Sequence, residues 1–322
     1  MTARAIYERL FGRLDRALVA ATGCIVALLV AGALYDRNFL SADYLVQQLQ
    51  VAAFLGVIAT GVMLVVVLGH IDLSIPWVVT IGGMMSTAAA GHTGAAGWFA
   101  IPFAIACGLA IGIVNGIGVA YLRVPSMIFT LATNTVAQGL MVVHTGGFSP
   151  QDSSSDAMRF IATGEVAFGI PNGLIVWGLI GAGTVFLFTR TTFGRAIYAI
   201  GNRERAAYLS GVGTQRIVMF AFAISGGLSA LGGVLLAGYA SHAAQAMGDP
   251  YLLQSIAAVV LGGTSILGGR GSYLGTVAGV VLITLLQSIL SVMQMEEFGR
   301  QVIYGVVIIV MLLLYGRERR LR

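Results

Sequence analysis

Residues 68–83, LGHIDLSIPWVVTIGG, place polar side chains directly before a long apolar run. Asp72 or Ser74 followed by Pro76 is typical of the first turn of a helix, where a side-chain oxygen accepts bonds from unpaired N–H groups. A carboxylate is also favoured at the positive end of the helix dipole. The pattern predicts a helix cap, with direct contact between Asp72 and a substrate as the alternative. Both roles can coexist where a broken helix end presents its polar groups to a cavity.

The composition outside this stretch is that of a membrane protein. The 322 residues are 57% hydrophobic and 10% charged, with a mean hydropathy of +0.90, whereas soluble domains carry roughly 25% charged residues. All 18 basic residues are arginines, so the chain has no P-loop lysine and no lysine nucleophile. We therefore expect ATP and magnesium to bind a partner chain and no cofactor to bind this one. We also expect no nucleic-acid partner, because membrane topology accounts for the arginines.

Ten apolar runs are long enough to span a bilayer, which takes about 20 residues each. The sequence therefore predicts an all-α polytopic protein, with residues 1–322 forming a single transmembrane domain in membrane lipid. The predicted spans are residues 17–35, 45–69, 73–91, 97–121, 125–145, 172–189, 216–240, 251–268, 272–293 and 299–315.

Charge predicts the orientation of these spans. With both termini inside, the inner segments hold fifteen arginines and five acids, and the outer loops hold three arginines and eight acids. This follows the positive-inside rule and predicts that both termini are cytoplasmic. The predicted parts are a cytoplasmic tail at 1–16, a periplasmic loop at 146–171 and a cytoplasmic loop at 190–215.

Glycine accounts for 44 residues and repeats at intervals of four in two spans, in GIVNG at 112–116 and GTVAG at 275–279. Small residues let helices approach closely in lipid, so tight packing is the favoured interpretation. The spans before these two begin near Asp72 and Asp249, each with a proline close by. Together the patterns predict an inverted repeat, in which the second to fifth spans correspond to the seventh to tenth.

Polar side chains on one face of the fifth span are candidates for a substrate pathway. Thr130, Asn134 and Gln138 recur every four residues and so share a face, which is expected to avoid lipid. Hydrogen bonds between helices explain the stripe equally well. Weaker candidates lie on other spans: Gln47, Gln50, Asn115 and Gln287.

Four segments resemble one family in the same order. GHIDLSIPWVVTIGG (69–83) is similar to the Gly-Gly-Ile-Asp-Leu-Ser signature of permeases of ribose- and xylose-type sugar ABC importers, with His70 at the second glycine. The other three are LRVPSMIFTLATN (122–134), GRAIYAIGNRERAAYLSGV (194–212) and VVLGGTSILGGRGSYLGTVAG (259–279). The resemblance implies a type II ABC importer fold. It also implies three partners, namely a second permease copy or paralogue, a cytoplasmic ATPase and a periplasmic sugar-binding protein.

By its place in that family, the loop at 190–215 is the coupling helix that docks into the ATPase. Asn202 is the expected N-cap of a short helix, with Gly211 or Gly213 as its stop. An ordinary arginine-rich inner loop is the alternative. The expected docking residues are Arg195, Asn202, Arg203, Glu204, Arg205, Ala206, Ala207 and Leu209.

The favoured function is ATP-driven import of a neutral monosaccharide by alternating access. No acid or arginine falls at mid-span, which fits a neutral cargo, including a nucleoside or polyol, and disfavours an ion-coupled carrier. An intramembrane enzyme or metal site is not expected, because the four histidines are scattered.

Overall fold

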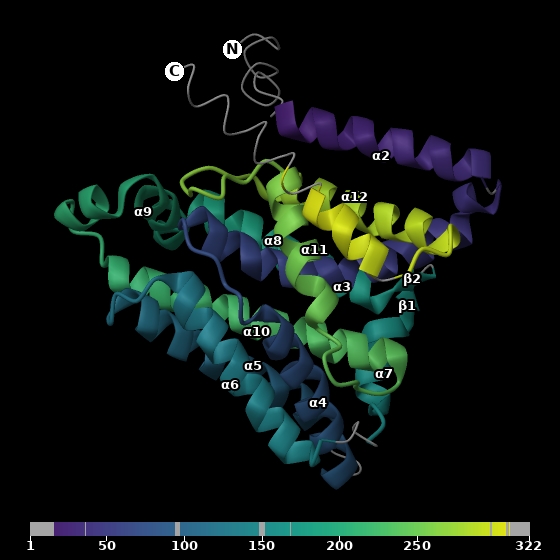
Figure 1. The fold of residues 1–322 in the computed structure, drawn as a ribbon, viewed down its shortest axis with the longest axis horizontal. Coiled ribbons are helices and arrows are strands. Elements are labelled where there is room, and N and C mark those ends of the chain that lie inside the picture. Colours follow the sequence, from purple (N-terminus) through teal and green to yellow (C-terminus); the bar gives the residue numbers. More distant parts are fainter. Residues whose placement is uncertain are drawn as a thin grey trace.

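The computed structural model describes residues 16–35, 37–93, 97–147, 152–167, 169–296, 298–306 and 309. Within this part the chain is almost entirely helical (Figure 1). The elements are α2 (Arg16–Tyr35), η1 (Arg37–Leu40), α3 (Ala42–Val67), α4 (Ile75–Thr93), α5 (Gly97–Ala120), α6 (Ser126–Thr145), α7 (Asp156–Thr163), β1 (Glu165–Ala167), β2 (Ile170–Pro171), α8 (Asn172–Arg190), α9 (Thr192–Leu209), α10 (Thr214–Ala240), α11 (Asp249–Leu261) and α12 (Tyr273–Val292). Strands β1 and β2 form one antiparallel pair.

Seven of the described helices are long and apolar enough to cross a membrane: α2, α3, α5, α6, α8, α10 and α12. The all-α polytopic fold is therefore confirmed, whereas the count of ten spans is not. α4 and α11 are shorter apolar helices. The predicted last span, 299–315, lies only partly within the described residues, of which 298–306 are helical.

One predicted boundary is wrong by seven residues. The span expected at 251–268 ends at Leu261 as α11, because Gly262 and Gly263 follow and Gly263 has a φ of +88°. Such left-handed backbone is accessible to glycine and ends a helix. The remaining residues up to 272 form a connection at one end of the bundle.

Helices α3 and α10 form the centre of the bundle. Side chains of α3 are buried on all sides from Ala52 to Val67, as expected for a helix that is hydrophobic all round. α10 packs against α3, α4 and α5, and Figure 1 shows it running between the α4–α5–α6 group and the α11–α12 group. By contrast, α2 is mostly exposed beside α12 and carries apolar side chains outward, as a lipid-facing helix does.

Helix contacts follow the pattern expected of two related units. Suppose that α3, α4 and α5 correspond to α10, α11 and α12. The contact between α5 and α10 then has its counterpart in the contact between α12 and α3. Likewise α4–α5 corresponds to α11–α12, and α4–α10 to α11–α3. The pairwise contacts therefore agree with two related units, and the inversion of one unit relative to the other stays a prediction.

Glycines make the closest of these contacts. A methyl group on Gly112 of α5 would lie 2.3 Å from the carbonyl oxygen of Phe222 on α10, and one on Gly279 of α12 would lie 1.9 Å from the carbonyl oxygen of Ala258 on α11. Both neighbours are backbone atoms that cannot turn aside. The interpretation of these glycines as packing residues is confirmed.

The two long connections lie at opposite ends of the bundle. Figure 1 shows α9 at the left end and α7 with β1 and β2 towards the right end, and α8 runs between them. Both regions contain more regular structure than the sequence predicts. Residues 190–215 are largely helix α9, and the described part of 146–171 holds α7 and the strand pair.

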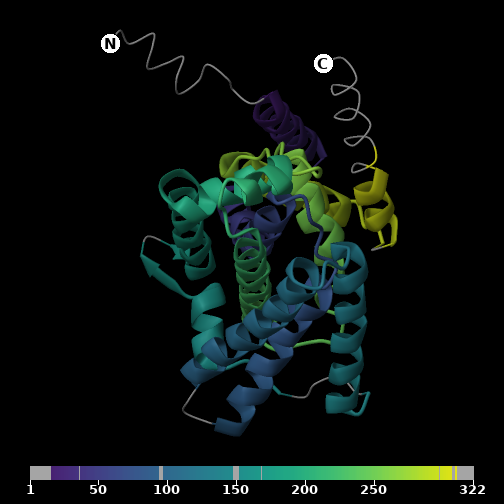
Figure 2. The same cartoon turned by 90° about the vertical axis from the view of Figure 1, so that its left-hand side faces the viewer.

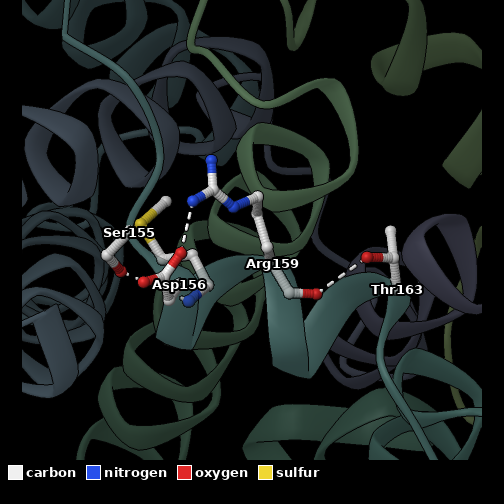
Figure 3. Close-up of polar contacts among 5 residues, drawn as sticks. Ser155, Asp156, Arg159 and Thr163 are labelled. Carbon is white, nitrogen blue, oxygen red and sulfur yellow. Dashed lines mark hydrogen bonds and ion pairs between the residues drawn. The ribbon is translucent and has the colours of Figure 1, made fainter.

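Helix α7 is fixed by its own polar residues (Figure 3). The Ser155 hydroxyl caps it by accepting a bond from the Met158 N–H (3.3 Å), and Arg159 pairs with Asp156 one turn earlier. The Thr163 hydroxyl donates to the Arg159 carbonyl (2.9 Å).

The cytoplasmic tail predicted at 1–16 lies outside the described residues except for Arg16.

Candidate functional site

Residues 68–74 connect α3 to α4 and carry the buried carboxylate of the opening motif. Asp72 is 4% exposed. Its Oδ1 accepts bonds from both the N–H (2.9 Å) and the hydroxyl (2.6 Å) of Ser74. This turn fixes the chain just before α4 begins at Ile75, so Asp72 orders the residues that lead into the helix, and its two bonds come from Ser74 and not from an N–H group of the helix itself. Contact with substrate stays a prediction.

Helix α6 supplies three side-chain acceptors for the connection before α4 and for its first turn. Spacing by four places three of its side-chain oxygens on one face, opposite residues 71–77. The bonds run from Ile71 N to Ser126 Oγ (3.3 Å), from Leu73 N to Thr130 Oγ1 (2.9 Å) and from Trp77 N to Asn134 Oδ1 (3.3 Å). The first N–H groups of a helix have no partner within it, and lipid offers none. Helix-to-helix hydrogen bonding therefore accounts for Thr130 and Asn134.

Asn115 of α5 completes this cluster. It is fully buried, and its Nδ2 donates to the Ser74 hydroxyl (2.8 Å). Its Oδ1 is buried and has no hydrogen-bond partner among the described residues. Asp72, Ser74 and Asn115 thus link the start of α4 to α5, while one amide oxygen stays available.

The other pathway candidates do not join this cluster. Gln138 is exposed on α6, one turn beyond Asn134. Gln47 is exposed near the start of α3, and Gln287 is half-buried near the end of α12. Those two helix ends meet, because Tyr44 and Ser288 share a hydrogen bond. Asp72 follows the opposite end of α3, so Gln47 and Gln287 lie most of a span away from the cluster with which they were predicted to share a pathway. Gln50 also lies outside the cluster, and its side-chain amide donates to the Ala162 carbonyl of α7 (3.1 Å).

A cavity of about 540 Å³ opens beside the cluster, at the α9 end of the bundle. Its walls come from the connections between α3 and α4 and between α5 and α6, and from α5, α6, α9 and α10. Its lining residues are His70, Val119, Ala120, Arg123, Val124, Pro125, Ser126, Met127, Ile128, Glu204 and Val218. Ser126 belongs to both the cavity and the α6 stripe.

His70 is a half-buried residue of the cavity wall. Its ring packs against that of Phe222 on α10, with centroids 6.0 Å apart. Burial lowers the pKa of the imidazole below its ordinary 6.5, nearby Glu204 raises it and Arg123 lowers it. The ring is therefore neutral at pH 7, with one nitrogen donating and the other accepting. Neither ring nitrogen bonds to any residue in the described ranges.

Arg123 and Glu204 form an ion pair (2.5 Å) on the cavity wall. Arg123 follows α5 and has a φ of +58°, a left-handed conformation uncommon for a residue with a side chain. Glu204 follows Arg203, where extended backbone (φ −160°, ψ 98°) breaks α9. The pair therefore ties α9 to the α5–α6 connection.

Helix α9 differs from the expected short helix. It begins at Thr192 with Thr191 as its cap, so the prediction of Asn202 as an N-cap is wrong. The break falls one residue later, at Arg203, so the short helical segment that follows begins at Glu204 and ends at Leu209. The predicted stop is confirmed at Gly211, which follows Ser210 with a φ of +83°.

Most of the expected docking residues are exposed at the α9 end: Arg195, Asn202, Arg203, Arg205, Ala206 and Leu209. Two are not. Ala207 is buried against the bundle, and Glu204 pairs with Arg123. The amphipathic segment therefore has one face that packs against the bundle, so Ala207 and Glu204 are not free for the docking that was predicted for them.

Ser126 and the cavity were not among the predicted site features. Ser126 continues the spacing of Thr130 and Asn134 by one turn, so the stripe could have been extended from the sequence. The cavity joins four separate parts of the chain and has no local signal. Among the described residues, no group of three His, Cys, Asp or Glu side chains could hold a metal ion; Cys24 and Cys107 are free thiols.

Comparison with known proteins assigns the family. Residues 44–312 match the family model described as "Branched-chain amino acid transport system / permease component". The ribose import permease protein RbsC of Haemophilus influenzae is 31% identical over 90% of each chain. That of Escherichia coli is 30% identical over 92% of this chain and 93% of the relative.

A relative with a different named cargo is equally similar. The autoinducer 2 import system permease protein LsrC of Yersinia pestis is 32% identical over 92% of this chain and 83% of its own length. No solved structure matches this chain significantly. The chain therefore belongs to this permease family and is a ribose-type ABC transporter permease, a multi-pass membrane subunit of sugar import.

Proposed function

We propose that this chain forms the translocation pathway of an ATP-driven importer, which releases a neutral monosaccharide to the cytoplasm. Ribose and autoinducer 2 are the cargoes named in its relatives. The polar cluster around Asp72 carries the proposal, because its amide, hydroxyl and single buried carboxylate suit a polyhydroxylated neutral solute. A periplasmic binding protein delivers the cargo, and a cytoplasmic ATPase supplies the energy. Both termini and α9 are cytoplasmic, and α7 is periplasmic, in the bacterial inner membrane.

The exposed end of α9 is the proposed docking surface for the ATPase. Arg203, Arg205 and Leu209 are exposed there, and Leu209 is 78% exposed. An apolar side chain in that position is available to a partner pocket. Arg190 and Arg270, which flank neighbouring connections at the same end, fit the cytoplasmic side of a membrane.

A second permease copy or paralogue is proposed to cover α6. Figure 2 places this helix along one edge of the bundle, and its Gln138 amide is exposed there. An amide facing lipid is costly, whereas the same group facing a partner or a watery path is satisfied.

The docking proposal is tested by introducing a charge at each end of the molecule. We expect Leu209→Asp to abolish co-purification of the neighbouring ATPase and ATP-driven uptake in vesicles, because it places a charge in an apolar contact. Val166→Asp on β1, 68% exposed at the opposite end, is the matched control and should keep the ATPase. Equal loss in both variants would contradict docking through α9, and uptake that survives deletion of the ATPase gene would contradict ATP coupling.

The role of Asp72 is tested by Asp72→Asn. The amide oxygen can still accept the two Ser74 bonds, so we expect an assembled complex with lost transport. Loss of folded protein would instead restrict Asp72 to a capping role. Ligand identification on the binding protein encoded beside this chain would distinguish a monosaccharide from a nucleoside or polyol.

A further inference from the structure

We propose that the cavity at the α9 end is a second cargo site, and that His70 contacts the cargo there as it leaves the membrane. The inference rests on the proposed function, because it needs a neutral hydroxylated cargo. It adds a site that is separate from the buried cluster around Asp72 and a residue, His70, to which no role was assigned above.

The cavity has the size and the variety of walls expected of a small-molecule site. Its volume of about 540 Å³ lies within the roughly 300–1,000 Å³ typical of such sites. Most of its lining is apolar, with a few polar groups converging from different parts of the chain: His70 from the α3–α4 connection, Ser126 from α6, and the Arg123–Glu204 pair. Apolar walls with few polar groups suit the faces and hydroxyls of a sugar.

His70 is the polar group that is both positioned and available. Phe222 supports one side of its ring, and its main-chain N–H is fixed by the Val65 carbonyl (3.1 Å). The Ser126 hydroxyl, in contrast, already accepts a bond from Ile71. A neutral imidazole offers one donor and one acceptor, which matches a sugar hydroxyl.

Charge in the cavity is balanced. The ionisable groups in its lining are His70, Arg123 and Glu204, and the latter two neutralise each other at 2.5 Å. A charged cargo would therefore find no unpaired opposite charge in this lining, whereas a neutral cargo needs none. The cavity therefore favours the same cargo class as the Asp72 cluster.

The cavity is next to the element proposed to respond to ATP. Glu204 belongs to the outer part of α9, beyond the break at Arg203, and forms part of the cavity wall. Movement of that segment would pull on the Arg123 pair and change the mouth of the cavity. Cargo held by His70 would then be released on the α9 side.

Uptake of labelled D-ribose, D-xylose, ribitol and adenosine by vesicles with the complete complex tests the site. For the compound that the wild-type complex transports, we expect His70→Ala to lower the maximal rate about fivefold, the effect of one hydrogen bond. His70→Gln keeps a donor and an acceptor and should retain most of the rate. His144→Ala, at an exposed histidine near the far end of α6, is the matched control.

A chemical readout separates cargo contact from a structural effect. In a Cys24→Ser, Cys107→Ser background, the M127C variant places a thiol on the cavity wall, and its alkylation by N-ethylmaleimide is followed with each compound present. We expect the transported compound to slow alkylation, and His70→Ala to remove that protection.

Unchanged uptake in His70→Ala, or protection that persists in it, would overturn the site. If the wild-type complex transports none of the four compounds under ATP, the proposed function fails instead. The alkylation assay still decides the cavity in that case, because absence of protection by all four compounds overturns it.

Discussion

Helices α4 and α11 occupy corresponding places in the two units, yet their first turns are built differently. At the start of α4, Asp72 precedes the helix and is buried, and α6 accepts the neighbouring N–H groups. At the start of α11, Asp249 is itself the first helical residue and is exposed. An acid near a proline thus marks a helix start in both units, but only one of the two acids enters the interior.

The α11 start obtains its partners from α4. The Gly248 N–H donates to the Thr80 hydroxyl (3.1 Å), which donates in turn to the Pro76 carbonyl (2.9 Å). A methyl group on Gly248 would lie 2.0 Å from that same carbonyl oxygen. The two first turns are therefore joined, and a change in one is expected to disturb the other.

The largest expected effect comes from adding a side chain at Gly248, where the first turns of α4 and α11 meet. Gly248→Val should destabilise the protein by about 3 kcal/mol, because overpacking against backbone cannot be relieved by a rotamer change. We expect loss of monodisperse protein in detergent or a sharp fall in the midpoint of thermal unfolding. Gly183→Ala on α8, where a methyl group would meet nothing within 4 Å, is the control. A stable Gly248→Val protein would disprove the close contact between the two starts.

Removal of the buried carboxylate is expected to have the next largest effect. Asp72→Ala leaves the Ser74 N–H and hydroxyl without their acceptor in a buried turn, at a cost of about 2 kcal/mol. Asp72→Asn should recover most of this stability, since it can accept the same bonds. Thermal unfolding of the two variants measures the difference, and equal stability would show that the bonds to Ser74 contribute nothing.

A smaller loss is expected from the hydroxyl that joins the two starts. Thr80→Val keeps the shape of the side chain but leaves the Gly248 N–H without its acceptor, costing about 1 kcal/mol. Thr22→Val on α2, whose exposed hydroxyl bonds only within its own helix, should be close to neutral. If both variants unfold at the wild-type temperature, the link through Thr80 has no energetic importance.

The smallest effect is expected at the exposed acid of α11. Asp249→Asn removes a charge near a helix N-terminus, where exposure and solvent limit its contribution to at most about 0.5 kcal/mol. Uptake and thermal unfolding should both stay near wild type. A loss as large as that of Asp72→Ala would mean that the two acids are equivalent despite their different burial.

Local chemistry made much of the fold predictable. Predicted spans at 97–121, 125–145 and 172–189 match α5, α6 and α8 within a residue at each end. The apolar length of each run and the charges or prolines at its ends are read directly from neighbouring residues. The prediction failed where a helix end depends on distant contacts, as at Asn202, because α9 packs along the end of α3 and the connection after α11.

Part of the site was predictable for the same reason. The spacing of Thr130 and Asn134 placed them on one face, and Asp72 with Ser74 indicated a cap. Gln47 and Gln287 were grouped with them by polarity alone, and the fold puts them at the other end of α3. Polarity indicates that a side chain needs a partner, but it does not identify the partner.

The sequence by itself determined that this protein crosses a membrane, where most of its long helices lie and which surfaces need close packing, because lipid imposes these rules on each segment separately. Only the tertiary structure decided which acceptors satisfy the start of α4, why one acid of a matched pair is buried, and that His70 faces a cavity. Those outcomes depend on atoms brought together from helices tens or hundreds of residues apart, and no local pattern records which helices will meet.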